Sequence, residues 1–177
     1  MDLFNRLNKC EKPEPIDEIE GLWINNATCG AMVYGEKGYV GEAYKYDIIS
    51  MYPSIMCSKN MSFPLTSGTF RNITIDEEEQ IQFYACGIYR CTIDIQNNKM
   101  IRSNKNNYYT HITMNQAIAL KYKVSLIHDN EHNALQYNNC IIGSHIFGEF
   151  VDIIFPLKQA GNKRAKRYGG HCVSKIL

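Results

Sequence analysis

The sequence predicts an α+β fold, with antiparallel strands first and helices last. Phe83–Ile95 alternates β-branched and aromatic residues with other types, which is typical of a strand. Phe147, Phe150, Val151 and Ile154 recur at the spacing of one helix face. Hydrophobic residues make up 45% of the 177 positions, enough for a core, and no run of about 18 apolar residues predicts a membrane span.

The first fifty residues are expected to deliver the chain to Asp47 along two strands of a hairpin. Residues 1–20 form a polar lead-in. The apolar stretch within Gly21–Tyr34 and the loose alternation of Tyr39–Ile49 predict the strands, and the glycine-bounded turn between them predicts the hairpin.

The later elements follow from local signals of capping, periodicity and proline. Helices are expected from Ser54 to Ser58, at the acidic run Asp76–Glu79 and from Thr113 to Lys121, and short strands over Val124–Ile127 and Cys140–Ile142. Pro156 should kink or end the last helix, because proline lacks the N–H that a helix interior requires.

Charge is unevenly distributed along a chain whose net charge is only +1. Acidic residues predominate from Glu11 to Glu20, whereas residues 157–177 carry basic residues and no acid. The basic end is typical of a phosphate-binding surface, although a solvated helix face has the same composition. Seven cysteines without a C-x-x-C pair argue against a zinc ribbon, a redox centre or a secreted disulfide framework, and for an intracellular protein.

The most informative string is Tyr46–Met56, which contains the pattern D-x-x-S-x-Y-P-S from Asp47 to Ser54. A carboxylate at a strand end, followed by a turn and a helix, places a hard oxygen ligand beside backbone N–H groups that can bind phosphate. This string resembles motif A of the family B DNA polymerases.

The resemblance implies a role for each residue of the string. Asp47 would be the catalytic carboxylate and a ligand of Mg²⁺ in a two-metal site, with the backbone carbonyl of Ile48 as a second ligand. Ser50 and Met51 would offer backbone N–H groups to the triphosphate of the incoming nucleotide. Tyr52 would stack under the deoxyribose and exclude a ribose 2′-hydroxyl as a steric gate.

A second resemblance concerns the protein-primed branch of that family, which serves phages, viruses and linear plasmids. The string Phe147–Asp152 precedes Lys158 by the spacing seen before the fingers lysine of these enzymes. Lys158 would therefore hold the triphosphate. The roughly hundred residues between Pro53 and Phe147 are similar in size to the insertion that contacts the priming terminal protein in that branch.

These resemblances imply a partial polymerase palm, an antiparallel sheet with packed helices, joined to the start of a helical fingers subdomain. The expected divisions are a lead-in, a palm segment with motif A, the terminal-protein-contacting insertion and the first fingers helices, at 1–20, 21–57, 58–145 and 146–177.

Motif B, K-x-x-x-N-S-x-Y-G, is incomplete in either of two registers. In the preferred register, Lys175 is its nucleotide-binding lysine; in the other, Tyr168-Gly169 is its final pair. Four basic residues of the segment 157–177 are expected to contact DNA: Lys163, Arg164, Lys166 and Arg167. The Y-x-D-T-D of motif C does not occur in these residues, so the chain alone should lack the second carboxylate and be inactive.

The predicted function is thus that of a fragment of a DNA-directed DNA polymerase, acting on a DNA template, a DNA or protein primer and deoxynucleoside triphosphates. The alternative is a non-catalytic module derived from such an enzyme, which binds DNA or a terminal protein; Tyr108, Tyr109 and Tyr122 could then stack on bases, or be ordinary core residues. The expected setting is intracellular, associated with a virus, plasmid or organelle, without a membrane partner.

Overall fold

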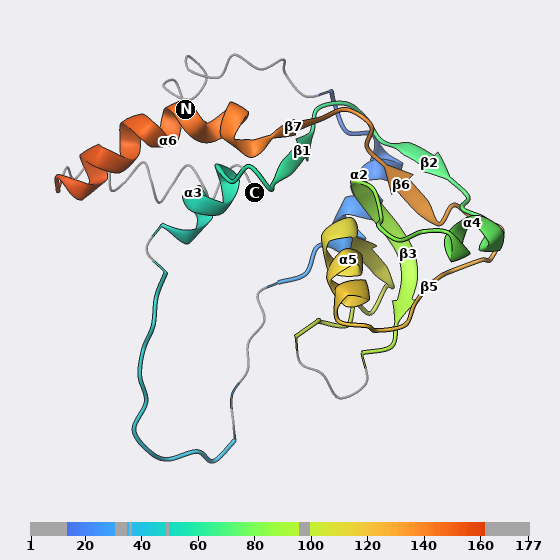
Figure 1. Cartoon of the computed structure of the whole chain (residues 1–177), viewed down its shortest axis with the longest axis horizontal. Coiled ribbons are helices and arrows are strands. Elements are labelled where there is room, and N and C mark those ends of the chain that lie inside the picture. The colour runs from blue at the N-terminus through green and yellow to red at the C-terminus, as the bar shows by residue number, and fades with distance from the viewer. Residues whose placement is uncertain (1–13, 31–34, 36, 49, 96–99, 162–177) are drawn as a thin grey trace. The chain divides into compact units, whose positions relative to one another are not determined.

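A computed structural model describes residues 14–30, 35, 37–48, 50–95 and 100–161 (Figure 1). The chain divides into two compact units. We call the first the sheet unit; it contains Pro13–Gly38 and Thr66–Asn139. We call the second the helical unit; it contains Met1–Lys12, Tyr39–Leu65 and Cys140–Leu177. Helices and antiparallel strands occur together, so the predicted α+β class is confirmed.

The sheet unit is built around one long strand, β3 (Gly87–Ile93). The strand order is β2-β6-β3-β4, and β5 pairs with the far half of β3. All pairings are antiparallel, with Tyr89 opposite both Tyr109 and Ala134. The other strands have three residues each: β2 (Thr69–Arg71), β4 (Tyr108–Thr110), β5 (Val124–Leu126) and β6 (Ala134–Gln136).

Two groups of buried side chains hold this sheet to its helices. The larger group contains Tyr89, Cys91 and Met114, all fully buried, and includes the inner face of α5 (His111–Ala119). The smaller group joins Trp23 of α2 to Ile88 and Leu135. Burial of such side chains is the main favourable term in folding.

A helix, α2 (Glu18–Ala27), occupies the first half of Gly21–Tyr34, the stretch for which a hairpin strand was predicted, so that prediction is wrong there; residues 31–34 lie outside the described ranges. Its start is fixed by Asp17, whose carboxylate accepts a hydrogen bond from the Glu20 N–H at 2.8 Å. An aspartate at this position satisfies one of the free N–H groups of the first turn. Once the helix forms, it buries Trp23 against the rings of Phe70 and Tyr108.

The acidic run does form a helix, α4 (Ile75–Glu79), as predicted. Thr74 caps it, and the Thr74 and Glu77 side chains each bond to the other residue's backbone N–H. Beside it, Asn133 is fully buried and hydrogen-bonds through its amide group to both the N–H and the carbonyl of Ile73. The Asn133 side chain thus pairs with the backbone of Ile73 as a neighbouring strand would.

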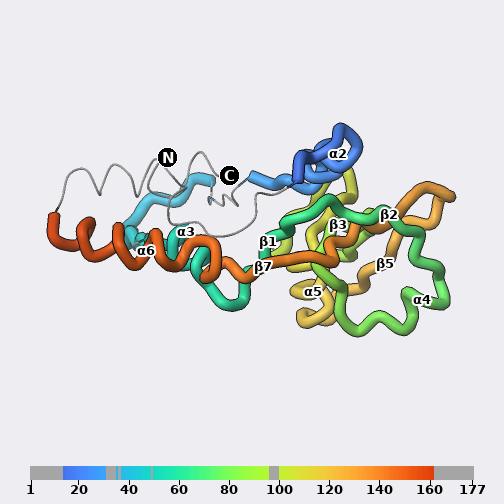
Figure 2. The backbone as a smooth tube through the Cα atoms, turned by 90° about the horizontal axis from the view of Figure 1, so that it is seen from above, coloured from blue at the N-terminus to red at the C-terminus, as the bar shows by residue number. Residues whose placement is uncertain are grey.

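Within its described residues, the helical unit contains two helices and one short strand pair. These are α3 (Met51–Met56), β1 (Ser62–Pro64), β7 (Cys140–Ile142) and α6 (Gly143–Gln159). β1 and β7 pair antiparallel, and α3 lies beside α6 in both views of the backbone (Figures 1 and 2).

Pro156 was predicted to kink or end the last helix; an end at Pro156 is excluded, because α6 continues to Gln159. Proline removes only the hydrogen bond that its own nitrogen would have donated. The Pro156 carbonyl still accepts from the Ala160 N–H at 2.9 Å, so the final turn is complete. None of the helices in the described ranges is both long and apolar enough to span a membrane.

The strand predicted over Tyr39–Ile49 is also absent: residues 39–48 pair with no other segment of the described chain, and Ile49 lies outside it. The alternating side chains are exposed, with Tyr44 at 80% and Tyr46 at 88%. A strand requires a neighbour for its backbone groups, and alternation alone does not supply one. The expected order of sheet before helices is corrected as well, because among the described elements the helix α2 precedes the strands.

His111, at the first position of α5, makes the stability of the sheet unit depend on pH. Its Nδ1 lies 3.2 Å from the Gly87 nitrogen and 3.3 Å from the Gly87 oxygen. Burial lowers the pKa of His111, and its backbone contact with Gly87 only partly opposes this. Folding therefore favours the neutral ring, so its contribution to stability is complete above a pH of about 6.5 and falls as the pH drops through that value.

We expect His111→Asn, which keeps a side-chain acceptor but cannot titrate, to lose less stability between pH 7.5 and 5.5 than the wild type. Denaturant unfolding followed by the fluorescence of Trp23, the only tryptophan, measures this. Equal losses in the two proteins would contradict the assignment.

Candidate nucleotide site at the start of α3

The D-x-x-S-x-Y-P-S string folds into a turn followed by α3, and several of its residues have local structural roles. The Met51 N–H donates to the Ile48 carbonyl at 3.3 Å, which closes the turn. The Ser54 N–H and hydroxyl both donate to the Ser50 carbonyl at 3.0 Å. Pro53 lies in the first helical turn, where its missing N–H would have no partner.

Ser50 adopts a left-handed backbone conformation, with φ of 57°. This conformation costs a residue other than glycine roughly 1–2 kcal/mol. Backbone strain of this kind is concentrated at functional sites in proteins, where the surrounding structure maintains it.

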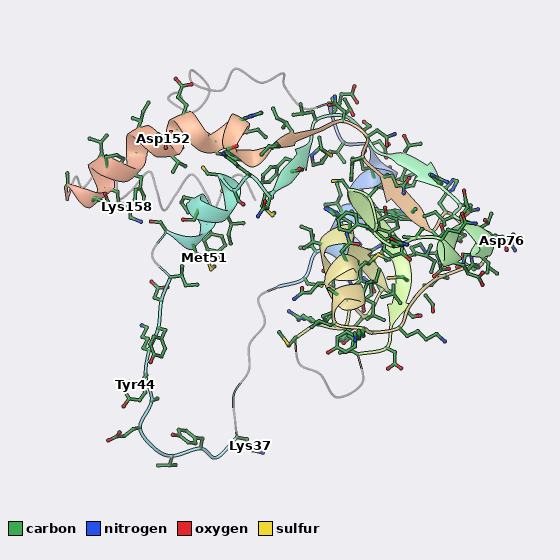
Figure 3. The ribbon with its side chains drawn as sticks, viewed as in Figure 1. Lys37, Tyr44, Met51, Asp76, Asp152 and Lys158 are labelled. Carbon is green, nitrogen blue, oxygen red and sulfur yellow. The ribbon has the colours of Figure 1, made fainter. Side chains whose placement is uncertain are left out.

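The structure brings Ser50 together with Lys158, a predicted site residue 108 positions away. Lys158 Nζ donates to Ser50 Oγ at 2.7 Å. Lys158 belongs to the last turn of α6, and its side chain points toward the start of α3 (Figure 3). An ammonium group has three donors, so this one bond leaves capacity for further acceptors.

A second charged residue of α6, Asp152, also acts on α3. Burial raises the pKa of the Cys57 thiol, and the negative charge of Asp152 raises it further. Asp152 lies in the middle of α6 (Figure 3), and Cys57 is the C-cap of α3. No pattern in the sequence singled out Asp152 as a residue facing α3, because helical periodicity does not identify the partner helix.

The other predicted residues of this segment are accessible. Asp47 is exposed, Ile48 is 69% exposed and Tyr52 is 56% exposed. No group of three or more acidic, histidine or cysteine side chains in the described ranges is arranged to hold a metal ion. Asp47 therefore offers a single carboxylate here, with the Ile48 carbonyl next to it in sequence.

The remaining predicted site residues lie outside the described residues: Lys163, Arg164, Lys166, Arg167 and Lys175. Of the tyrosines considered for base stacking, Tyr109 is buried in the core and Tyr108 packs its ring against Trp23 at 5.0 Å. The hydroxyl of Tyr122 is buried as well. Tyr108 and Tyr109 thus have the strand and core roles that were the alternative interpretation.

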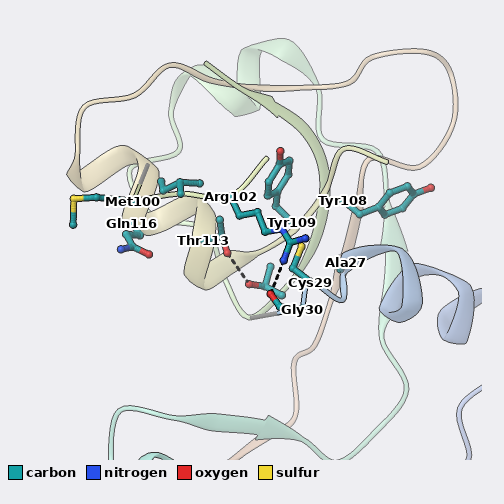
Figure 4. A pocket seen from close by; sticks show the side chains of 11 residues that line it. Ala27, Cys29, Gly30, Met100, Arg102, Tyr108, Tyr109, Thr113 and Gln116 are labelled. Atoms are coloured by element: carbon teal, nitrogen blue, oxygen red, sulfur yellow. Dashed lines mark hydrogen bonds between the residues drawn. The ribbon is translucent and has the colours of Figure 1, made fainter. Parts of the chain in front are cut away.

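The sheet unit has a pocket of its own, with a volume of about 320 Å³ (Figure 4). Its lining includes Cys29, Arg102, Tyr109 and Gln116, and Arg102 Nη1 donates to the Gly30 carbonyl at 2.8 Å. Tyr108 and Tyr109, considered above for base stacking, are part of the lining, but none of the residues predicted to bind metal, nucleotide or DNA is. It was not predicted, since residues from α2, β4 and α5 meet only in the folded unit.

Comparison with known families identifies the chain. A family profile described as DNA polymerase type B, organellar and viral, matches residues 22–176. The chain belongs to this family, and DNA polymerase is therefore its class of enzyme, with a place in DNA replication. The match covers parts of both units and every predicted site residue. Searches of curated proteins and of solved structures found no match.

Proposed function

We propose that the helical unit binds the triphosphate of an incoming deoxynucleotide during templated DNA synthesis. The observation that carries this proposal is the 2.7 Å contact between Lys158 Nζ and Ser50 Oγ. The two residues come from the two separate strings that resemble polymerase motifs. A lysine ammonium is a compact positive charge that binds phosphate, and its remaining donors are available to do so.

Within this proposal, each residue near the turn has a distinct role. Lys158 neutralises phosphate charge, and the backbone of Ser50 and Met51 lies against the phosphates. The Met51 N–H is already bonded to Ile48 at 3.3 Å, so phosphate must compete for it. Tyr52, more than half exposed, has a ring surface free for a sugar and acts as the steric gate against ribose.

The donor types beside the turn fit Mg²⁺. Asp47 supplies a carboxylate, and the Ile48 carbonyl has one lone pair left after accepting from Met51. Mg²⁺ is commonly held by one or two carboxylates together with water and substrate phosphates, so a full cage of protein ligands is not required. When bound, the ion would neutralise charge on the phosphates. Asp47 and Ile48 would hold it against the turn that binds the nucleotide.

We further propose that the enzyme belongs to the protein-primed branch. Support comes from the Phe147–Asp152 string before Lys158 and from the length of the segment between motif A and α6. In that case part of the region 58–145 contacts a priming terminal protein. The second metal-binding carboxylate of the synthesis reaction has to come from outside these 177 residues.

The test is the binding of dATP with Mg²⁺ to the full chain, measured by calorimetry and by phosphorus NMR. Lys158→Ala should weaken binding about 10- to 100-fold, the range that corresponds to a hydrogen bond with a charged group. Lys59→Ala removes an exposed lysine of the same unit and should leave the affinity unchanged. Equal effects of the two substitutions, or no binding by the wild type, would overturn the proposal.

A further inference from the structure

Gly143, the first residue of α6, lies against the end of α3. A Cβ placed there would be 1.9 Å from the Met56 carbonyl oxygen and 3.1 Å from its carbonyl carbon. It would also be 3.0 Å from Cε2 of Phe63. The first two atoms are backbone at the end of α3 and cannot rotate away as a flexible side chain could. Only glycine lets α6 begin this close to α3.

The start of α6 is held from several sides. The Gly143 N–H donates to the Met61 carbonyl at 2.8 Å. The pairing of β1 with β7 sets Ser62 opposite Ile142, directly before the helix. One turn into the helix, the Phe147 ring meets Phe63 edge to face at 5.4 Å. These contacts define where the helix begins and in which direction it leaves the strand pair.

The other end of the same helix carries Lys158. Fifteen residues separate it from Gly143, which corresponds to about 22 Å of helix. A methyl group at position 143 requires α6 to move by about 1.5 Å to restore an ordinary van der Waals distance from Met56. A rigid displacement of that size away from α3 would stretch the contact between Lys158 and Ser50, now 2.7 Å, beyond the length of a hydrogen bond.

We propose that Gly143 is a positioning residue for nucleotide binding: its missing side chain seats α6 against α3, so that Lys158 reaches the turn at Ser50. This inference rests on the proposed function for its consequence in nucleotide binding, but the positioning of Lys158 can be measured without any nucleotide.

The helix contains its own control. Gly148 is in the same helix, five residues further on, and a Cβ there meets nothing within 4 Å. Gly148→Ala therefore adds the same methyl group without the clash and also favours the helix. Any difference between Gly143→Ala and Gly148→Ala reports on the contact with α3.

The experiment measures how fast the Lys158 amine of the full chain is acylated, by mass spectrometry of the peptides. A hydrogen-bonded amine reacts more slowly, so Ser50→Ala sets the rate of the released lysine. Gly143→Ala should raise the rate to that level, about 10- to 100-fold, the factor of a hydrogen bond that involves a charged group. Gly148→Ala should leave it unchanged. An unchanged rate in Gly143→Ala, with α6 still protected in hydrogen exchange, overturns the proposal.

Phe63→Leu is the second variant, because Gly143→Ala can unfold the start of α6. It weakens the contact with Phe147 without adding a clash and should give an intermediate acylation rate. If α6 loses protection in Gly143→Ala, the rate in Phe63→Leu decides, and the wild-type rate there overturns the proposal.

Added Mg²⁺ and dATP should slow acylation of Lys158 in the wild type and in Gly148→Ala, but not in Gly143→Ala. If nucleotide protects none of the proteins while Gly143→Ala still releases Lys158, the proposed function fails and the positioning role of Gly143 stands.

Discussion

Replacing Leu135 with alanine is expected to lower the free energy of unfolding of the sheet unit by about 3 kcal/mol, within the range measured for buried leucines. Leu135 is completely buried between Trp23 and Ile88, and its Cδ1 would be only 2.4 Å from a Cβ placed at Gly68. Its surroundings are tightly packed strand and helix, which close poorly around a cavity.

Trp23 makes this prediction easy to measure, because the only tryptophan of the chain lies in the same cluster as Leu135. Denaturant unfolding followed by its fluorescence reports on the sheet unit. Leu22→Ala is the matched control: Leu22 is 56% exposed on α2 and should cost less than about 0.5 kcal/mol. Similar midpoints for the two variants would show that Leu135 does not belong to a tight core.

Replacing Asp47 with asparagine is expected to abolish the dependence of dATP binding on Mg²⁺. The change removes the negative charge of the proposed ligand and keeps its size. Loss of even an outer-shell partner of a metal ligand commonly costs 10- to 100-fold in metal affinity, and loss of a direct ligand should cost at least about 100-fold. Binding of dATP in the variant should then be the same with Mg²⁺ and with a chelator.

The matched control is Asp76→Asn, which neutralises an exposed aspartate of α4 in the sheet unit and should retain the full Mg²⁺ dependence. Titrations of dATP at fixed and zero Mg²⁺ compare the three proteins. Retention of the Mg²⁺ dependence in Asp47→Asn would remove this residue from the site, while the Lys158 contact is tested separately by its own variant.

Elements with strong local signals were the ones the sequence could predict. The acidic run Asp76–Glu79 indicated α4, and alternation indicated β3, which is shorter at both ends than expected. The three-residue strands β2, β4 and β6 were not predicted, because their pairing partners lie far away in the sequence. The strand expected before Asp47 does not form, because alternating side chains do not show which other strand would pair with this segment.

The candidate site was predictable only through resemblance. No periodicity or spacing links Ser50 to Lys158, and their contact exists because α6 packs beside α3. The sequence also could not predict that position 143 requires glycine, because the atom that excludes a side chain there belongs to Met56, 87 positions earlier. Close approach between elements is a property of the fold, and a single sequence records it only as one glycine among 12.

Because of the left-handed backbone at Ser50, a substitution that raises the stability of this protein can remove a group of the proposed site. This matters for any directed evolution of the protein. Glycine at position 50 would relieve the conformational cost and should be enriched by a screen for thermal tolerance alone. The same change deletes the hydroxyl that accepts from Lys158. A library ranked only by melting temperature would therefore favour clones that have lost the contact proposed to support nucleotide binding.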